Sequence, residues 1–234
     1  MHKYKGGIKV LFTLPNLITL VNLSLGILVI YYALNKILLY GFLMILLAAL
    51  VDSLDGLIAR ALHLESPIGK ELDSLADMIS FGAAPSIMFI LIHEQLLAVL
   101  VAVIYTSCGA LRLARFNIYG SKKFFEGLPI PAAAVFISST MITIGVPIYR
   151  IILIILASAL MISPITYPSI KVQRGIYAVS TLIILGFLTM LYLEAFYPVS
   201  FAMVFTKAVW IFSLYYVMLS PLIFWWLNRF WRKS

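Results

Sequence analysis

Four aspartates lie within 26 residues of a predominantly apolar chain: Asp52, Asp55, Asp73 and Asp77. On helices, the three-residue spacing of the first pair and the four-residue spacing of the second each place two carboxylates on one face. Each unpaired acid costs roughly 2.5–3.5 kcal/mol at membrane depth, and carboxylates that share a face also repel. The set contains no histidine or cysteine, so its ligand chemistry favours Mg²⁺, Mn²⁺ or Ca²⁺ over zinc. Two such ions would balance the four charges and attract an anionic substrate such as a diphosphate.

The segment between the acids adds small and basic residues: Gly56, Ala59, Arg60 and Gly69. Gly56 and Ala59 lie on or beside the face of Asp55, where their small size leaves room for a ligand to approach the helix. Close packing against a neighbouring helix is the structural alternative for these two residues. The planar guanidinium of Arg60 can bind a phosphate through several N–H groups. The segment therefore favours a cation-dependent site for a phosphate-bearing substrate, and the alternative is a solvated helix end with ordinary caps.

The elements that must position these residues are long apolar helices. Hydrophobic residues make up 63% of the 234 residues and charged residues 11%, with a mean hydropathy of +1.08, whereas soluble domains carry about 25% charged residues. A helix needs about 20 apolar residues to span a bilayer. We therefore predict an all-α, polytopic membrane protein with about eight transmembrane helices in a single domain, residues 1–234. The predicted helices correspond to hydrophobic segments at about residues 15–34, 38–60, 73–92, 96–117, 129–148, 151–168, 176–195 and 201–227.

The distribution of basic residues predicts the orientation of these helices. The formal net charge is +8, which in a soluble protein would suggest a nucleic-acid partner. If the N-terminus is cytoplasmic, only Lys36, Arg150 and Lys207 of the 17 basic residues fall on the opposite side. Because cytoplasmic loops are enriched in Lys and Arg, both termini and the aspartates are predicted to face the cytoplasm, in the cytoplasmic membrane. The basic residues then set topology and contact membrane lipids, and no nucleic-acid partner is expected.

The spacing of these residues resembles a known signature. The string Asp52-x2-Asp55-Gly56-x2-Ala59-Arg60-x8-Gly69-x3-Asp73-x3-Asp77 is similar to that of the CDP-alcohol phosphotransferase family, with every signature position present. The resemblance implies an enzyme that displaces CMP from a CDP-linked lipid with an alcohol, using two divalent cations at the membrane–cytoplasm boundary. It also implies a six-helix core and a homodimer. The two added helices would be the last pair, with the helices after about residue 195 peripheral.

The same resemblance implies roles for individual residues. Asp52, Asp55 and Asp73 would be metal ligands. Asp77 would be both a metal ligand and the base that accepts the proton of the incoming hydroxyl. The nucleotide-binding positions of the signature are matched by Gly56, Ala59, Arg60 and Gly69.

Four further stretches narrow the choice of alcohol. The sequences LPNLITLVNLSLG at 14–26, SFGAAPS at 80–86, LRLARFN at 111–117 and EGLPIPAAA at 126–134 resemble the phosphatidylserine synthases of this family. This resemblance implies transfer of the phosphatidyl-type group of CDP-diacylglycerol or CDP-archaeol to the hydroxyl of L-serine, with release of CMP.

Two arginines and two polar residues are further candidates for substrate contacts. Arg112 and Arg115 lie three residues apart near the cytoplasmic end of the fourth predicted helix. Arginine can bind the carboxylate of serine, or a phosphate of the donor, through two N–H groups; contact with lipid headgroups is the alternative. Asn16 and Thr19 are candidates for nucleotide contacts, although Pro15 also makes this an ordinary helix start.

Three other interpretations stay open at this point. A related enzyme would take glycerol phosphate or inositol phosphate as acceptor, and such a phosphate dianion should require a denser basic pocket. A cation transporter would use the aspartates as its ion site, but the acids lie near one membrane face and the other helices offer few ionisable residues. A structural membrane scaffold would not need the aspartates at all.

Overall fold

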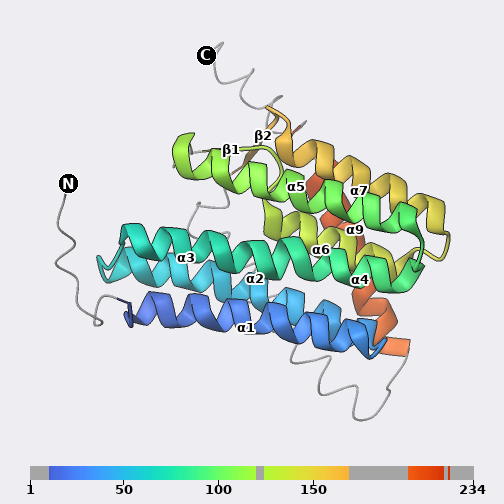
Figure 1. The fold of residues 1–234 in the computed structure, drawn as a ribbon, viewed down its shortest axis with the longest axis horizontal. Helices are drawn as coiled ribbons and strands as arrows, with labels where there is room; N and C mark the ends of the chain where they lie inside the picture. The colour runs from blue at the N-terminus through green and yellow to red at the C-terminus, as the bar shows by residue number, and fades with distance from the viewer. Residues whose placement is uncertain (1–10, 120–123, 169–199, 219–220, 222–234) are drawn as a thin grey trace.

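Long helices that lie side by side make up most of the part of the chain that the structure describes (Figure 1). This computed structural model describes residues 11–119, 124–168, 200–218 and 221. The helices and strands are α1 (Leu14–Leu34), α2 (Leu38–Ala61), α3 (Pro67–Asp77), the π-helical turn η2 (Met78–Ala83), α4 (Ala84–His93), α5 (Leu96–Tyr119), β1 (Phe124–Glu126), α6 (Ile130–Thr143), α7 (Pro147–Ile162), β2 (Thr166–Pro168) and α9 (Ser200–Met218).

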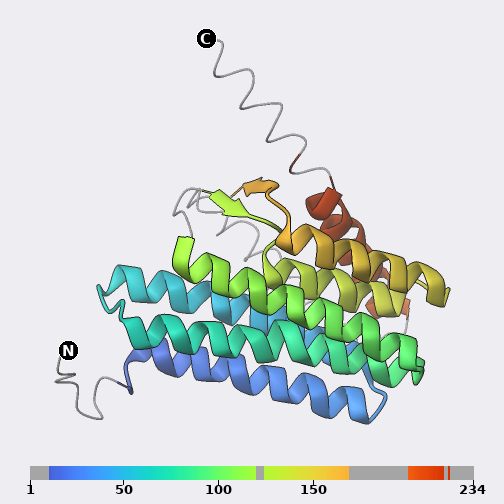
Figure 2. The ribbon, with the colours of Figure 1, turned by 45° about the horizontal axis from the view of Figure 1, so that its top comes forward.

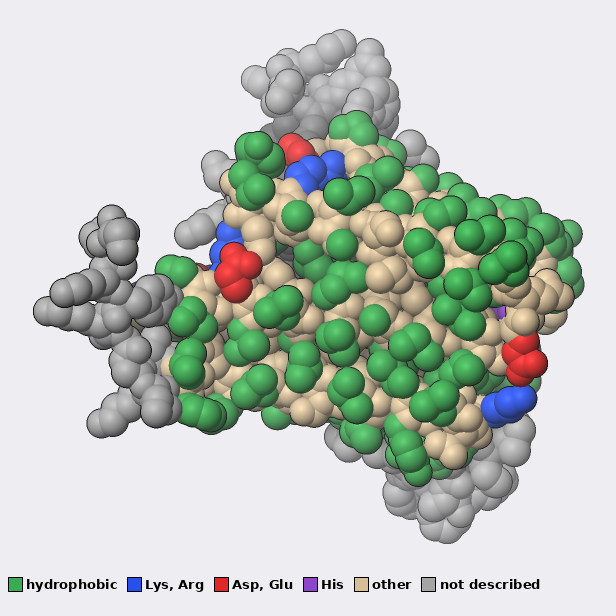
Figure 3. Space-filling model, in the orientation of Figure 1, with side chains coloured by type: hydrophobic (Ala, Val, Ile, Leu, Met, Phe, Trp, Pro, Cys, Tyr) green, Lys and Arg blue, Asp and Glu red, His purple; other side chains and the backbone are tan. Residues whose placement is uncertain are grey.

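Four helical stretches among the described residues are long and apolar enough to cross a membrane. They are α1, α2, the continuous run through α3, η2 and α4, and α5, while α6, α7 and α9 are apolar but shorter. Figure 3 shows one face of the molecule, on which hydrophobic side chains cover the lengths of the helices and charged side chains lie toward the ends. The protein is therefore a mostly helical membrane protein, as predicted.

The helix that carries Asp73 and Asp77 begins at Pro67, six residues before the apolar segment predicted from about residue 73, and it includes Gly69 as the spacing of Gly69, Asp73 and Asp77 predicted. The hydroxyl oxygen of Ser66 accepts a hydrogen bond from the backbone N–H of Gly69 at 3.0 Å, and Pro67 occupies the first turn. A serine cap followed by proline is a strong helix start, because the cap satisfies an amide that has no intrahelical partner. Asp73 consequently lies inside the helix, with Asp77 one turn later on the same face.

The boundaries of two later helices also differ from the prediction. α6 ends at Thr143 and α7 begins at Pro147, whereas the sequence predicted helices over residues 129–148 and 151–168. Proline is favoured in the first turn of a helix, where its missing N–H is not needed, and it is unfavourable in a helix interior. Pro147 therefore starts α7 and does not extend α6.

A two-stranded sheet is a small departure from the predicted all-α fold. β1 and β2 pair antiparallel, with Glu126 opposite Thr166, and Figure 2 shows them as adjacent arrows near the ends of α5 and α7. Pro164 follows the end of α7 and is incompatible with a continuing helix. Tyr167 is fully buried, and its hydroxyl donates to the carbonyl oxygen of Val217 at 3.1 Å. The sheet thus connects the segment after α5 with the C-terminal part of α9.

The predicted helices near the C-terminus are described only in part. The predicted helix at 176–195 lies outside the described residues, and the one predicted over 201–227 is seen as α9. α9 packs against α6, where the indole N–H of Trp210 donates to the hydroxyl of Thr140 at 3.0 Å. The total of eight helices therefore stays a prediction.

The main core surrounds the π-helical turn that follows Asp77. Phe81 of this turn, Val29 of α1 and Tyr105 of α5 are all fully buried in it. The hydroxyl of Tyr105 donates to the carbonyl oxygen of Phe81 at 2.8 Å, which satisfies a buried backbone acceptor within the turn. The turn is therefore fixed to α5 immediately after the last aspartate of the signature.

Candidate active site

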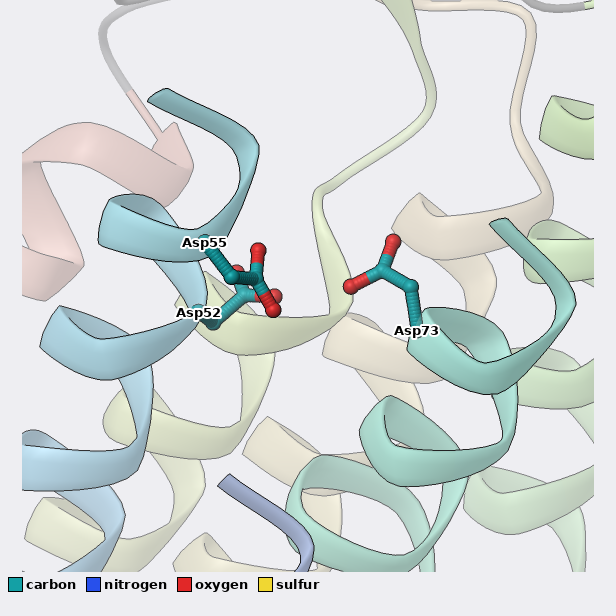
Figure 4. A group of neighbouring side chains, drawn as sticks. All are labelled: Asp52, Asp55 and Asp73. Carbon is teal, nitrogen blue, oxygen red and sulfur yellow. The ribbon is translucent and has the colours of Figure 1, made fainter. Parts of the chain in front are cut away.

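Three aspartates from two helices converge at one end of the bundle. Asp52 and Asp55, in the C-terminal part of α2, face Asp73 of α3 (Figure 4). One carboxylate oxygen from each residue lies within 4.8 Å of the other two, which is close enough for the three to share a cation that takes ligands at about 2.0–2.6 Å. Asp77 joins the group, since the carboxyl of Asp52 is within hydrogen-bonding reach of both Asp73 and Asp77.

Helix α1 supplies hydrogen-bond donors to two of these carboxylates. The hydroxyl of Thr19 donates to Oδ2 of Asp55 at 2.8 Å, and the amide of Asn22 donates to Oδ1 of Asp77 at 3.3 Å. Both α1 side chains are buried. The structure thus places Thr19, a predicted nucleotide contact, against a carboxylate of the cluster. Together the two bonds attach one aspartate of α2 and one of α3 to the same helix.

The ligand atoms of this cluster suit a hard divalent cation. All are carboxylate oxygens, and Oδ1 of Asp73 is buried without a hydrogen-bond partner among the described residues. Burial of a carboxylate oxygen is costly unless it is hydrogen-bonded, paired or bound to a metal. Arg60 and Arg112 lie within electrostatic range of members of the cluster, but two positive charges do not balance four carboxylates. The residues therefore fit Mg²⁺, Mn²⁺ or Ca²⁺ better than zinc.

The small residues of the signature lie at the same end of the bundle as the aspartates. A Cβ atom at Gly56 would lie 3.3 Å from a terminal nitrogen of Arg60, so the exposed Arg60 side chain folds over this glycine. A Cβ atom at Gly69 would lie 3.0 Å from the amide oxygen of Asn16, which is buried. Ala59 is half-buried on α2. Because the two glycines have no side chains, Arg60 lies close to the backbone of α2 at Gly56, and Asn16 lies close to the backbone of α3 at Gly69.

The structure separates the two arginines that the sequence suggested as substrate contacts. Arg112 of α5 is only 5% exposed, and its guanidinium lies 5.4 Å from the centroid of the Phe116 ring. It also lies within electrostatic range of Asp52, Asp77 and the phenol of Tyr216 on α9. Arg112 is thus placed beside the aspartate cluster and near Tyr216.

Arg115 makes a different set of contacts, although it lies only one turn later on α5. Its guanidinium donates at 2.8–3.3 Å to four backbone carbonyl oxygens, those of Glu126, Met161, Ile162 and Ser163. The last carbonyl groups of a helix have no intrahelical partners, and basic side chains often satisfy them. Arg115 therefore links α5 to the end of α7 and to β1.

Two residues near the cluster, Asn22 and Tyr216, were not among the predicted site residues. For Asn22 the sequence held a signal, because Asn16, Thr19 and Asn22 recur every three residues in a mostly apolar helix and so follow one side of it. For Tyr216 it held none, since its position depends on how α9 packs after a long connection.

Comparison with known proteins identifies the family that the signature resembles. The family model for CDP-alcohol phosphatidyltransferase matches residues 12–165, which include the aspartate cluster, Asn16, Thr19, Arg112 and Arg115. The chain is 41% identical over 176 residues to a CDP-diacylglycerol–serine O-phosphatidyltransferase from Methanocaldococcus jannaschii, covering 74% of this chain and 84% of that protein.

Two further relatives have sequences similar to that of this chain. An archaetidylserine synthase from Methanothermobacter thermautotrophicus is 41% identical over 166 residues, 67% of this chain and 70% of the relative. A CDP-diacylglycerol–serine O-phosphatidyltransferase from Bacillus subtilis is 37% identical over 162 residues, 68% of this chain and 91% of the relative. With the signature intact, its aspartates gathered at one end of the bundle and relatives matched over most of their length, the chain belongs to the CDP-alcohol phosphatidyltransferase family.

Proposed function

We propose that this protein transfers the phosphatidyl-type group of a CDP-linked lipid, CDP-diacylglycerol or CDP-archaeol, to the hydroxyl of L-serine and releases CMP. The convergence of Asp52, Asp55 and Asp73 beside Asp77 carries the proposal, because it provides an acidic site for a cation-bound diphosphate. The names of the three relatives support serine as the acceptor.

The four aspartates are the residues proposed to hold two divalent cations, Mg²⁺ or Mn²⁺, with Ca²⁺ as a further possibility. Bound cations would supply the positive charge that stabilises the attacking and leaving oxygens of a phosphoryl transfer. The unpartnered, buried Oδ1 of Asp73 supports this assignment. Arg60, exposed and folded over Gly56, is placed to bind a phosphate of the donor.

Asp77 is proposed as the base. Its carboxylate would accept the proton of the serine hydroxyl while the serine oxygen forms a bond to the lipid-bearing phosphorus and the bond from that phosphorus to the CMP oxygen breaks. A base must lie within about 2.6–3.2 Å of the proton donor. Asp77 is buried, at 6% exposed, so protein contacts fix the position of its carboxylate.

The remaining signature residues are proposed to bind the nucleotide and the acceptor. Gly56, Ala59, Gly69 and Asn16 would surround the CDP moiety, and Thr19 would act on it through Asp55. Arg112 is proposed to bind the carboxylate of serine, since its guanidinium lies beside the cluster and arginine binds carboxylates through two parallel hydrogen bonds. Arg115, a weaker candidate for this contact, is engaged with backbone carbonyls.

The site is proposed to open to the cytoplasm, with both termini on that side of the cytoplasmic membrane and with a homodimer as the working form. The basic residues of the sequence support this orientation through the positive-inside rule. Only the family resemblance supports the proposal of a homodimer.

The acceptor can be tested with purified protein, a CDP-lipid and three labelled acceptors: serine, glycerol 3-phosphate and inositol phosphate. We expect CMP release that depends on serine and on a divalent cation. CMP release with either phosphate-bearing acceptor but not with serine would overturn the choice of acceptor. Cation flux in proteoliposomes without any turnover of CDP-lipid would instead favour a transporter.

A further inference from the structure

We propose that Asn22 is a positioning residue of this site, whose amide fixes the carboxylate of Asp77 for its reaction with the acceptor. This inference rests on the proposed function, because it assigns to Asn22 the task of orienting the proposed base. The role is one of orientation and not of direct contact: Asn22 is 0% exposed, so a substrate meets Asp77 and not the amide behind it.

The hydrogen bond between the two side chains has a defined direction. The amide nitrogen of Asn22 donates to Oδ1 of Asp77 at 3.3 Å, and the opposite orientation would bring an amide oxygen against a carboxylate. The amide oxygen of Asn22 has no hydrogen-bond partner among the described residues, so the bond to Asp77 sets the orientation of the amide. One oxygen of Asp77 is therefore held by α1, and this bond restricts the rotation of the carboxylate that would meet the acceptor.

The backbone of Asn22 is fixed to the turn that follows Asp77. The hydroxyl of Ser80 donates to the carbonyl oxygen of Asn22 at 2.8 Å. One turn later on α1, a Cβ atom at Gly26 would lie 2.6 Å from Oγ and 2.8 Å from Cα of Ser80, so α1 and η2 touch through their backbones there. π-helical turns occur frequently at functional sites. Here the turn sets the position of α1 relative to Asp77.

The bond also has a counterpart three residues earlier in α1, where Thr19 donates to Asp55 at 2.8 Å. α1 therefore orients one carboxylate from each of the two helices that form the cluster. Groups that orient a metal-binding or catalytic side chain affect function strongly even without touching the substrate, typically by 10–100-fold when removed. Asn22 meets this description through a single, identified partner.

The test compares Asn22→Leu, which is similar in size but has no donor, with Ser24→Ala, an exposed position on the same helix. We expect Asn22→Leu to lower kcat by about 10–100-fold with an unchanged KM for the CDP-lipid, and Ser24→Ala to change neither. Asn22→Ser, whose hydroxyl is too short to replace the amide, is expected to behave like Asn22→Leu and serves if the leucine variant does not fold.

A second readout uses Mn²⁺ affinity, measured by electron paramagnetic resonance on protein without substrates. If Asn22 acts through Asp77, Asn22→Leu shifts Mn²⁺ affinity in the same direction as Asp77→Asn, and the double variant equals Asp77→Asn. An unchanged kcat in Asn22→Leu, or a further loss of Mn²⁺ affinity in the double variant, would overturn the inference. Failure of the proposed function is distinguishable, because the unmodified protein would then release no CMP with serine.

Discussion

Within the aspartate cluster, neighbouring carboxylates have different hydrogen-bond surroundings. Asp73 has a buried oxygen without a hydrogen-bond partner among the described residues, which suits it to bind a cation. Asp77 already receives a hydrogen bond from Asn22 on one oxygen, which restricts the orientation of its carboxylate. The spacing of the acids in the sequence predicted that they share faces, but only the structure distinguishes their surroundings.

Replacement of these two aspartates should therefore give different kinetic results. We expect Asp77→Asn to reduce turnover by about 10²–10⁴-fold, the usual contribution of a positioned base, while CDP-lipid binding in the presence of metal is retained in part. Asp73→Asn should weaken metal-dependent CDP-lipid binding as well. CMP release and CDP-lipid binding measured across a Mg²⁺ titration separate the two effects. Full activity in both variants would contradict the assignment.

The two arginines of α5 should also differ in what their loss changes. Arg112→Lys keeps the charge but loses the planar fork, so we expect the KM for serine to rise by about 10–100-fold, as for the loss of a hydrogen bond to a charged group. Arg115→Lys should instead lower the thermal unfolding temperature and leave the KM for serine unchanged, because its partners are backbone carbonyls. Steady-state kinetics and thermal unfolding of both variants check this, and an unchanged serine KM in Arg112→Lys would remove Arg112 from the acceptor site.

At the level of helices, the sequence predicts those features of the site that depend on the spacing of nearby residues. The Asp52–Asp55 and Asp73–Asp77 faces follow from helical periodicity, and Ser66 with Pro67 held the signal for the true start of α3. The π-helical turn after Asp77 was not predictable, because an inserted residue in a helix is stabilised by tertiary contacts such as the Tyr105 bond to Phe81. The small sheet likewise depends on long-range pairing.

The close approach of α1 to η2 can be tested at Gly26. A Cβ atom there would lie 2.8 Å from Cα of Ser80, so Gly26→Ala must push two backbones apart. We expect a loss of about 1–3 kcal/mol in stability, as for other overpacked sites, with lower turnover because α1 also carries Asn22. Gly145→Ala is the matched control, since no atom lies within 4 Å of a Cβ atom at that position. Thermal unfolding in detergent measures both, and equal stability of the two variants would contradict the close contact.

Over the whole molecule, charge is concentrated toward the ends of an apolar bundle, as Figure 3 shows for one face. At the end opposite to the aspartates, Lys36 and Glu94 form an exposed ion pair at 3.5 Å. Such a pair contributes little to stability, so either residue can be replaced without loss of the fold. The apolar composition predicted the membrane class and the basic residues predicted an orientation, whereas the arrangement of α9 beside Arg112 required the structure.

The orientation can be tested with single cysteines introduced at two exposed positions, Glu65 and Glu94, in a Cys108→Ala background. Glu65 lies between α2 and α3 near the aspartates, and Glu94 follows α4 at the other end. A membrane-impermeant maleimide added to intact cells should label Glu94→Cys, and should label Glu65→Cys only after the membrane is permeabilised. The reverse pattern would show that the aspartate cluster faces away from the cytoplasm.

The proposed reaction requires that α2 and α3 jointly hold divalent cations beside the substrate. The most direct measurement is anomalous X-ray scattering from crystals of the protein grown with Mn²⁺ and a CDP-lipid. We expect an anomalous peak within ligand distance of both Asp52 and Asp73, next to the diphosphate. A structure with the CDP-lipid bound at the cluster and no anomalous peak between these two carboxylates would contradict it.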